Sequence, residues 1–396
     1  MGANLTFAQA MVPLNILHVL RTPVGGLFRH VLDLALGQIA RGHRVGISAD
    51  SATGGPKADA SLAEIAPSLA LGVSRAPMRR APGPADLPAM MHVMRRIAES
   101  KADVVHGHGA KGGAYVRMAL NAKSAVRVYT PHGGSLHYDP RTLSGRLFLG
   151  TEKLLIGRGD VYIFESAYSA DVFRQKIGTP KTLSRVVHNG VKEAEFVPVE
   201  LAPDASDLLF VGELRQLKGV DVLIEAMAIL RDRGRRLTAT LVGDGPDRAQ
   251  FETHVARRGL QDAVHFAGAL SARQAFTRGK LLVVPSRTES LPYIVLEAAA
   301  AGKPLITTRV GGIPEIFGSQ AGLLVRPDDA PVLADAILDR LDRAEETARV
   351  TVTLRQRVAQ AFTIDTMVDG VLAAYDNALE ARNGGAPAFR QFAALL

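Results

Sequence analysis

Two glutamates, Glu289 and Glu297, stand eight residues apart in the stretch of this sequence whose pattern points most directly to chemistry. The pattern predicts a buried strand at 281–284, a tight polar turn, a helix at about 291–301 and a second buried strand at 304–308. Such a succession is one βαβ unit of a parallel sheet, with the helix as crossover. Because eight residues span a little over two helical turns, Glu297 can look back along the helix towards Glu289.

The turn before this helix is a predicted ligand site. Open α/β sheets bind ligands at the carboxyl edge of their strands, and a helix N-terminus offers free N–H groups to an anionic phosphate. A carboxylate at this place is poorly suited to bind the phosphate itself. We therefore expect Glu289 to accept hydrogen bonds from hydroxyl groups attached to the phosphate.

The pattern E-x7-E, followed by G-x-P and by V-G-G-I-P-E, resembles family 4 of the retaining glycosyltransferases, which have the GT-B fold. An isolated E-x7-E is weak, but the strand, the alanine-rich helix and the glycine pair around it make the match specific. The resemblance implies that Glu289 lies near the donor sugar and that Glu297 binds the ribose hydroxyls of the nucleotide. Gly311 and Gly312 would let the backbone approach the sugar or phosphate closely.

Length and composition are consistent with an enzyme of two domains. A chain of 396 residues is long for one core, and 47% hydrophobic with 22% charged residues is typical of a soluble globular protein. The absence of cysteine excludes a disulfide framework and a cysteine-ligated metal site. No apolar run is long enough for a membrane span, and the first residues do not resemble a signal peptide. We expect a cytoplasmic location, with peripheral attachment to the inner face of the cytoplasmic membrane.

The net charge of +8 is concentrated in residues 1–200, which hold 24 basic and 15 acidic residues. No zinc-finger, helix-turn-helix or aromatic-basic pattern accompanies this charge, so a nucleic-acid partner is not expected. Attraction to an anionic membrane surface is the preferred interpretation, and plain solubility is the alternative. The amphipathic, basic segment 141–158 is the predicted membrane-facing surface.

The N-terminal half opens with a strand at 15–20, a glycine turn and a helix from 27 to about 40. Gly25 and Gly26 suit a close backbone approach, but the sequence is not G-x-G-x-x-G, so the case for a dinucleotide cofactor is weak. The turn resembles the glycine loop of the family, which faces the interdomain cleft. Arg29 on the helix is accordingly a predicted acceptor-binding residue, with a solvated helix face as the alternative.

Three histidines lie at or just after the ends of predicted strands in this half. His106 ends a strand at 103–106 and begins a polar turn that includes His108, but no acidic or thiol partner follows at ligand spacing, so no metal site is expected. The resemblance instead implies that His108 and Lys111 line the cleft as acceptor-binding residues. His132 follows a strand at 126–130, between a proline and two glycines. The resemblance places it close to the donor sugar and the scissile bond, as the catalytic histidine.

The C-terminal half begins after an acidic, proline-containing linker at 193–207. A strand at 208–211 is followed by a turn with Arg215 and Lys218, which predicts a diphosphate site. Lys218 matches the lysine of the family's G-R-L-x-x-x-K-G turn, but the arginine position is Glu213. This departure puts the usual two-cation clamp in doubt, and we expect Arg215 to supply the second charge. The residues predicted to bind the donor are Gly25, Gly26, Gly212, Gly243, Gly245, Pro292, Tyr293, Glu297, Gly311 and Gly312.

Together these features predict a GT-B fold: two Rossmann-like, doubly wound parallel-sheet domains facing across a cleft. The domains are expected at residues 1–195 and 196–375, with 376–396 returning to the first domain. The resemblance implies a retaining, metal-independent transfer of a hexosyl group from a nucleoside diphosphate sugar to an acceptor hydroxyl, with no separate cofactor. The expected acceptor is a lipid-linked saccharide in polysaccharide or glycolipid assembly, and a soluble small acceptor is the rival. A nucleotide-sugar 2-epimerase and a catalytically inactive nucleotide-sugar-binding module are the alternatives.

Overall fold

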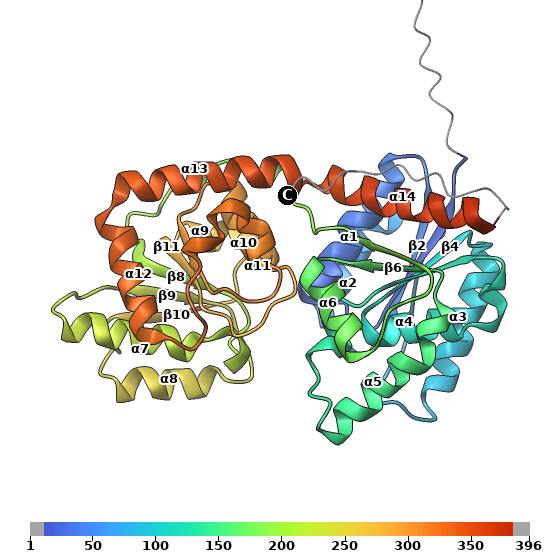
Figure 1. Ribbon diagram of the computed structural model, residues 1–396, viewed down its shortest axis with the longest axis horizontal. Helices are drawn as coiled ribbons and strands as arrows, with labels where there is room; N and C mark the ends of the chain where they lie inside the picture. Colours follow the sequence, from blue (N-terminus) through green and yellow to red (C-terminus); the bar gives the residue numbers. More distant parts are fainter. Residues whose placement is uncertain (1–11, 383–396) are drawn as a thin grey trace, which may run out of the picture. The chain divides into compact units, whose positions relative to one another are not determined.

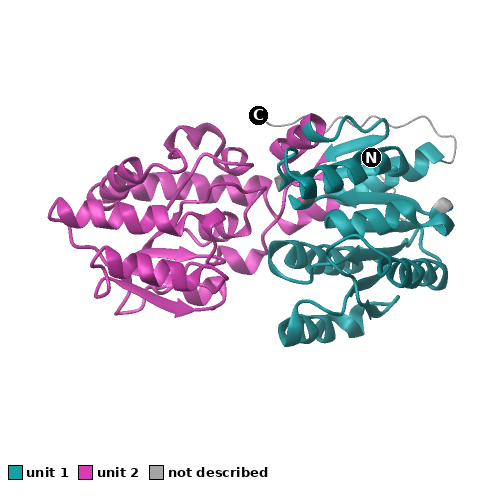
Figure 2. Cartoon of the chain, turned by 90° about the horizontal axis from the view of Figure 1, so that it is seen from below, with its two compact units in different colours: residues 1–163, 176–185, 371–388 teal, residues 164–175, 186–370, 389–396 magenta. Residues whose placement is uncertain are grey.

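The computed structural model describes residues 12–382, and two parallel sheets organise them (Figure 1). By compactness the chain divides into two units (Figure 2). Unit 1 holds the described residues up to 163, residues 176–185 and those from 371 onwards; unit 2 holds 164–175 and 186–370. The two sheets confirm the predicted α/β class. The domain limits at 195 and 375 stay a prediction, and the predicted tail from 383 onwards lies outside the described residues.

The seven-stranded sheet of unit 1 has the order β3-β2-β1-β4-β5-β6-β7. Its strands are β1 Asn15–Leu20, β2 Arg44–Asp50, β3 Val73–Ala76, β4 Val104–His108, β5 Val126–Thr130, β6 Val161–Phe164 and β7 Leu183–Val186. β1 pairs in parallel with both β2 and β4, so the strand order reverses between β1 and β4. In sheets of this kind the reversal point is where ligands bind.

Six helices connect these strands: α1 Gly25–Ala40, α2 Gly55–Ile65, α3 Asp86–Ser100, α4 Gly109–Met118, α5 Leu143–Leu155 and α6 Ala167–Lys176. Because helices cover both faces of a parallel sheet, its strands are apolar and buried along most of their length. β4 follows this rule, with every residue buried, although two of its five residues are histidines. The predicted polar turn at 106–109 is therefore wrong. His106 and His108 both belong to the strand, where their main chain pairs in register with β1 and β5.

The sheet of unit 2 has the order β10-β9-β8-β11-β12, with every pairing parallel. Its strands are β8 Ser206–Val211, β9 Ala239–Val242, β10 Val264–Gly268, β11 Gly279–Val284 and β12 Leu305–Thr307. Its helices are α7 Val220–Asp232, α8 Arg248–Arg257, α9 Ala272–Phe276, α10 Tyr293–Ala300, α11 Ile313–Phe317, α12 Ala330–Asp342 and α13 Ala344–Ala361. The order reverses between β8 and β11.

Alternate side chains of the central strands in unit 2 pack into two separate hydrophobic cores, one on each face of the sheet. Leu208 and Phe210 of β8 join the core on one face of the sheet, whereas Leu209 joins the core on the other face. Strand side chains alternate between faces with a period of two. An uninterrupted apolar strand therefore requires helices on both sides, which is the doubly wound arrangement.

The last helix, α14 (Ile364–Arg382), completes unit 1 from Val371 onwards. Tyr375 is fully buried there, and its hydroxyl lies 2.7 Å from His106 Nδ1. The guanidinium of Arg382 lies 3.1 Å from Asp160 Oδ2. Two contacts far apart on the helix thus hold it on unit 1.

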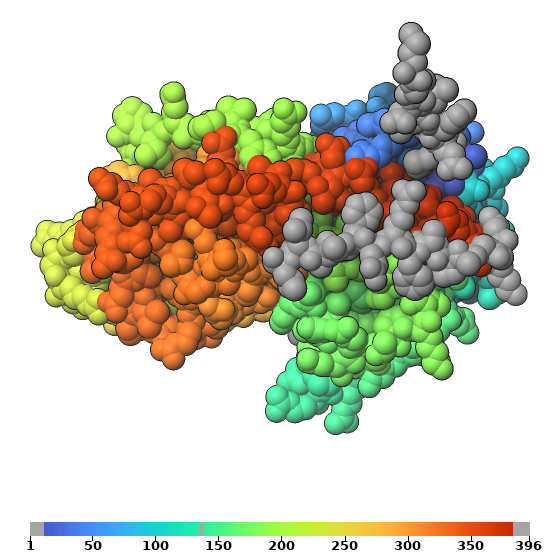
Figure 3. Space-filling view, turned by 45° about the horizontal axis from the view of Figure 1, so that its top comes forward, coloured from blue at the N-terminus to red at the C-terminus, as the bar shows by residue number. Residues whose placement is uncertain are grey.

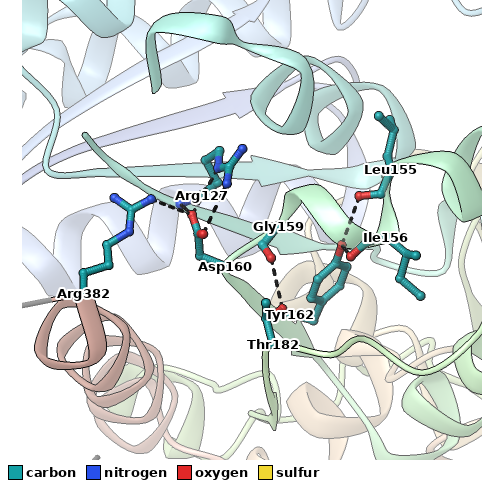
Figure 4. A network of polar contacts seen from close by, with 8 residues as sticks. All are labelled: Arg127, Leu155, Ile156, Gly159, Asp160, Tyr162, Thr182 and Arg382. Atoms are coloured by element: carbon teal, nitrogen blue, oxygen red, sulfur yellow. Dashed lines mark hydrogen bonds and ion pairs between the residues drawn. The ribbon is translucent and has the colours of Figure 1, made fainter. Parts of the chain in front are cut away.

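Figure 4 shows the surroundings of the second contact. Asp160, directly before β6, accepts hydrogen bonds from the main-chain and side-chain nitrogens of Arg127 on β5 as well as from Arg382. Nearby, Tyr162 donates to the carbonyl of Ile156 at 2.8 Å. The Asp160 carboxylate therefore connects the start of β6 with β5 and with α14.

Candidate active site

An ion pair stands at the reversal point of the unit 2 sheet. Lys218 ends the turn after β8, Glu289 lies in the loop after β11, and their Nζ and Oε1 atoms are 2.7 Å apart. Ser286 donates a hydrogen bond of 2.8 Å to the same carboxylate oxygen. Glu289 is 8% exposed. Two residues predicted separately thus meet where open α/β sheets bind their ligands.

The main chain of the Glu289 loop is held by the glycine pair that the sequence singled out. Gly311 has φ +58°, and a Cβ at this position would lie 1.7 Å from the carbonyl oxygen of Glu289. Gly312 donates its N–H to the carbonyl of Ser290 at 2.7 Å. Only a residue without a side chain fits at Gly311, because both the backbone conformation and the contact exclude a Cβ.

The turns after β8 and β9 also require close packing. Gly212 donates to the carbonyl of Val242 at 3.0 Å, and a Cβ on Gly243 would lie 1.8 Å from the carbonyl oxygen of Gly212. Gly245 approaches Leu214 in the same way. These predicted donor-binding glycines support the Lys218 turn through the main chain.

Arg287 was not predicted, and it fixes the Lys218 turn from the side of β11. Its guanidinium makes two hydrogen bonds to Asp221, of 2.8 and 2.7 Å, and one of 2.6 Å to Asp328. It also contacts the carbonyl of Gln216. A guanidinium with five donors suits such a role. Arg287 lies in the predicted polar turn 285–290, which was the only sequence signal for it. The residues that it contacts are far away in the sequence, so the contacts could not be predicted.

The remaining unit 2 candidates lie around this pair. Glu297 is half-buried on α10, which begins at Tyr293 after Pro292 rather than at residue 291. Arg215 immediately precedes the short helix that ends at Lys218, and its guanidinium lies 3.7 Å from Glu213, with both side chains about half exposed.

Glu315, which follows the glycine pair, caps α6. It accepts hydrogen bonds from the N–H groups of Ala167 and Tyr168 and from His188 Nε2, at 2.9 to 3.0 Å. Burial alone would raise the pKa of this carboxyl, but these hydrogen bonds lower it below the usual value. Glu315 therefore acts as a structural anion.

Five of the eleven histidines gather in unit 1, at the carboxyl ends of its central strands. We call them the histidine cluster: His18 on β1, His30 on α1, His106 and His108 on β4, and His132 after β5. Six pairs of imidazole rings within this cluster have centroids 3.9 to 5.8 Å apart. All but His132 are buried.

Hydrogen bonds join most of this cluster. His132 Nε2 lies 3.0 Å from His108 Nδ1, and His108 Nε2 lies 2.9 Å from His18 Nδ1. His18 Nε2 lies 2.8 Å from Gln38 Oε1 on α1. His106 instead reaches Tyr375 through Nδ1.

The surroundings keep four of these imidazoles neutral. Burial lowers the pKa of His18 to about 4, and it lowers the pKa of His106, His108 and His132 well below the usual value. Repulsion between neighbouring rings adds to this effect, because one imidazolium disfavours the next. At neutral pH each of these rings therefore carries a single N–H.

His132 has φ +50°, in the left-handed region that residues other than glycine rarely adopt. Gly133, with φ +74°, continues the turn. Strained backbone of this kind concentrates at functional sites, where the surrounding structure holds it in place. The predicted catalytic histidine is thus set apart from the rest of the cluster by its backbone and its partial exposure.

Two groups of three histidines have ring nitrogens within 4.8 Å of one another: His18, His106 and His108, and His30, His108 and His132. This spacing would suit a metal ion. However, both nitrogens of His106 and both nitrogens of His108 already lie at hydrogen-bonding distance from protein atoms. The expectation that no metal binds stays a prediction.

Sequence reasoning missed His18 as a partner of His108, and Gln38 as a partner of His18. Their signal lay in strand register, since His18 of β1 stands opposite His106 of β4. Local ligand spacing cannot show this pairing, because the two strands are nearly 90 residues apart.

The other N-terminal candidates are engaged in ion pairs or turns. Lys111 Nζ lies 2.6 Å from Asp86 Oδ2, and Arg29 Nε lies 3.3 Å from Asp33 Oδ2. Gly25 starts α1 with φ +64°, followed by Gly26. The roles predicted for these residues remain predictions.

Comparisons with known proteins agree with this architecture. The profile described as "Glycosyltransferase Family 4" matches residues 24–195, and that described as "Glycosyl transferases group 1" matches 205–343. The D-inositol 3-phosphate glycosyltransferase of Actinosynnema mirum is 30% identical over 70% of this chain and 72% of its own length. The glycogen synthase of Mycobacterium tuberculosis is 28% identical over 89% and 91%. The crystal structure of HepE from Anabaena with UDP and glucose superimposes with a TM-score of 0.76 at 20% identity, covering 92% of this chain and 99% of that one.

This chain belongs to the family 4, or group 1, glycosyltransferases, which have the GT-B fold. It is a retaining glycosyltransferase that uses a nucleotide-sugar donor. Among the described residues, no helix is long and apolar enough to span a bilayer.

Proposed function

We propose that this enzyme transfers a hexosyl group from a nucleoside diphosphate sugar bound at the Lys218–Glu289 pair. The observation that carries the proposal is this ion pair at the reversal point of the unit 2 sheet. An ammonium group has three N–H donors. One orients Glu289, and the others remain suited to a phosphate oxygen of the donor. The carboxylate, fixed by Lys218 and Ser286, is suited to accept hydrogen bonds from sugar hydroxyls.

The reaction breaks the bond between the anomeric carbon and the diphosphate oxygen and forms a bond to the acceptor oxygen on the same face. The acceptor hydroxyl gives its proton to the departing phosphate. Charge develops on the leaving diphosphate, so a preorganised cation contributes most of the stabilisation. Lys218 supplies this charge, Arg215 supplies a second one, and no metal ion takes part. His132 binds a hydroxyl of the donor sugar, as the family resemblance implies.

We propose a lipid-linked saccharide as the acceptor, because α5 offers a basic, partly apolar surface. Leu143 and Leu154 are 85% and 77% exposed, and Arg146 and Lys153 are exposed beside them. The one acidic residue of α5, Glu152, is instead buried against Arg117 at 2.7 Å. Figure 3 shows the α5 region, in teal-green, at the lower edge of unit 1. Basic residues near an anionic bilayer contribute about 1 kcal/mol each.

The relatives named above carry names that point to different acceptors, so this choice rests on the surface of α5. Sedimentation with vesicles tests it. The variant Arg146→Glu/Lys153→Glu should lose binding to vesicles that contain anionic lipid, whereas Arg236→Glu/Arg257→Glu, at exposed positions of unit 2, should retain it. Equal binding by both variants would favour the soluble acceptor.

Turnover with UDP-, GDP- and ADP-sugars tests the donor site. Lys218→Ala and Glu289→Ala should each lower kcat/KM for the one active donor by about 100-fold or more. Lys280→Ala is a matched control, because Lys280 pairs with Asp207 at 3.0 Å between the same two strands, β11 and β8, at their opposite ends. This control should keep its activity.

Each other outcome has a distinct meaning. Activity that survives both Lys218→Ala and Glu289→Ala would overturn the assignment of the site. Donor binding without turnover, with candidate acceptors present, would favour the inactive binding module. Release of a 2-epimerised sugar nucleotide would favour the epimerase.

A further inference from the structure

The histidine cluster contains a hydrogen-bonded chain that ends at the predicted catalytic residue. We call Gln38, His18, His108 and His132 the histidine chain. Its three contacts measure 2.8, 2.9 and 3.0 Å in this order. Gln38, His18 and His108 are buried, and His132 is partly exposed. The chain therefore runs from the core of unit 1 to a partly exposed imidazole.

The chemistry of Gln38 sets the direction of every bond in the chain. Its Oε1 can only accept, so the proton of neutral His18 is on Nε2. The other nitrogen of His18 must then accept from His108 Nε2–H, and His108 Nδ1 must accept from His132 Nε2–H. The single proton of His132 is thereby on Nε2. Its Nδ1 is left as an acceptor.

The amide of Gln38 is itself held from its other side. Its Nε2 donates to the hydroxyl of Tyr375 at 3.4 Å. That hydroxyl donates to His106 Nδ1 at 2.7 Å, and His106 Nε2 donates to Thr130 Oγ1 at 2.8 Å. Burial raises the pKa of Tyr375, so its proton stays in place as a donor. A flip of the Gln38 amide, which exchanges Oε1 and Nε2, would reverse the donor and acceptor roles along the whole chain of hydrogen bonds.

We propose that Gln38, His18 and His108 are positioning residues that fix His132 as the Nε2–H tautomer and so present its Nδ1 as a hydrogen-bond acceptor. This inference rests on the proposed function, in which His132 binds a hydroxyl of the donor sugar. An acceptor nitrogen selects a sugar whose group at that position can donate a proton. The contacted position must therefore carry a hydrogen-bond donor, such as a hydroxyl, rather than a group that only accepts.

The tautomer can be read directly in the free enzyme. Full-length protein with 15N-labelled histidine gives imidazole nitrogen shifts that distinguish a protonated from an unprotonated nitrogen, and single histidine variants assign the signals. Wild-type His132 should show a protonated Nε2 and an unprotonated Nδ1. A mixture of both tautomers would overturn the proposal.

The variant Gln38→Glu should invert the chain. A carboxylate at hydrogen-bonding distance favours the charged form of His18, which then has N–H donors on both nitrogens. His18 Nδ1–H would donate to His108 Nε2, and His108 Nδ1–H would donate to His132 Nε2. The proton of His132 would move to Nδ1. A purely structural role of Gln38 would not move this proton.

A kinetic readout connects the tautomer with selectivity. A series of monodeoxyfluoro donors replaces one sugar hydroxyl at a time by fluorine, which cannot donate. At the contacted position, the wild-type preference for hydroxyl over fluorine in kcat/KM should be larger than that of Gln38→Glu by about tenfold. Comparing the two enzymes cancels the intrinsic effect of fluorine on reactivity.

Control variants separate the possible failures. Thr130→Val removes one buried hydrogen bond at the far end of the network and should leave the His132 tautomer unchanged. If Gln38→Glu does not fold, Gln38→Met removes the acceptor and should yield mixed His132 tautomers. Unchanged His132 nitrogen shifts in both Gln38 variants would overturn the proposal even with normal transfer. Absence of transfer by wild type would instead refute the proposed function, because the shifts are measured without substrate.

Discussion

A single added methyl group at Gly311 should disable the donor site without touching any charged residue. The new Cβ of Gly311→Ala would lie 1.7 Å from the carbonyl oxygen of Glu289. The Glu289 main chain must therefore move by about 1 Å or more before the contact is tolerable. A displacement of this size at a catalytic group costs on the order of 100-fold in rate. We expect kcat/KM to fall by about that factor.

Stability should fall as well, in two parts. An alanine with φ near +58° costs about 1–2 kcal/mol for its left-handed backbone. The forced shift of the Glu289 loop adds about 1–3 kcal/mol, as overpacking does in general. Thermal denaturation followed by circular dichroism measures the total.

Gly234→Ala is the matched control for this prediction. Gly234 has φ +82°, but a Cβ there meets no atom within 4 Å. The variant Gly234→Ala should therefore lose stability only through its left-handed backbone conformation, and it should keep its activity. If Gly311→Ala transferred sugar as fast as Gly234→Ala, the inferred link between the glycine pair and Glu289 would be refuted.

Three further predictions concern charge. The lowered pKa of His18, about 4, means that the unfolded state binds a proton near pH 6.5 that the native state does not. The free energy of unfolding should therefore decrease as pH falls from 7 to 5, by about 2 kcal/mol from His18 alone. Urea unfolding measures it, and a free energy of unfolding that does not change over this range would contradict the prediction. Elemental analysis of purified enzyme should find much less than one zinc per chain; stoichiometric zinc that is lost in His108→Ala would show that the histidine cluster binds metal. Arg215→Ala should raise the KM for the donor about tenfold, because a charge-assisted hydrogen bond contributes about 1.5 kcal/mol or more, whereas an unchanged KM would leave Lys218 as the cation of that turn.

The βαβ unit at the donor site was predictable because its signals are local. The strand at 281–284, the helix near 291–301 and the strand at 304–308 were each found within about two residues. Lys218 and Glu289 were predicted one at a time from short motifs. Their contact follows from the pairing of β8 with β11, which the order of a doubly wound sheet supplies.

The histidine chain was not predictable by the same means. It joins β1, α1, β4 and the loop after β5, and no local spacing connects Gln38 to His108. The strand ending at His108 was also predicted too short, to end at residue 106, because two histidines alternating with two glycines are typical of a turn. A continuous strand there depends on neutral, mutually hydrogen-bonded imidazoles, which satisfy each other inside the sheet.

Two other misses have a compositional cause. Residues 51–88 are rich in alanine, glycine and proline, a composition typical of loops, yet they contain α2 and β3. The long helix α13 was not predicted. The buried residues of α13 are only Thr347, Leu354 and Val358, so few apolar positions mark this helix in the sequence, and packing decides instead.

The burial of Tyr375 in unit 1 has a consequence for how the chain acquires its structure. Residues 371–382 emerge from the ribosome after the whole of unit 2, yet Tyr375 supplies a core hydroxyl to His106 and Gln38. Domains generally fold during synthesis in order from the N-terminus. Unit 1 cannot complete its fold in that order, because its nascent sheet lacks this partner until residues 186–370 of unit 2 have been synthesised. A fragment that ends at the close of the N-terminal half would retain the same defect permanently.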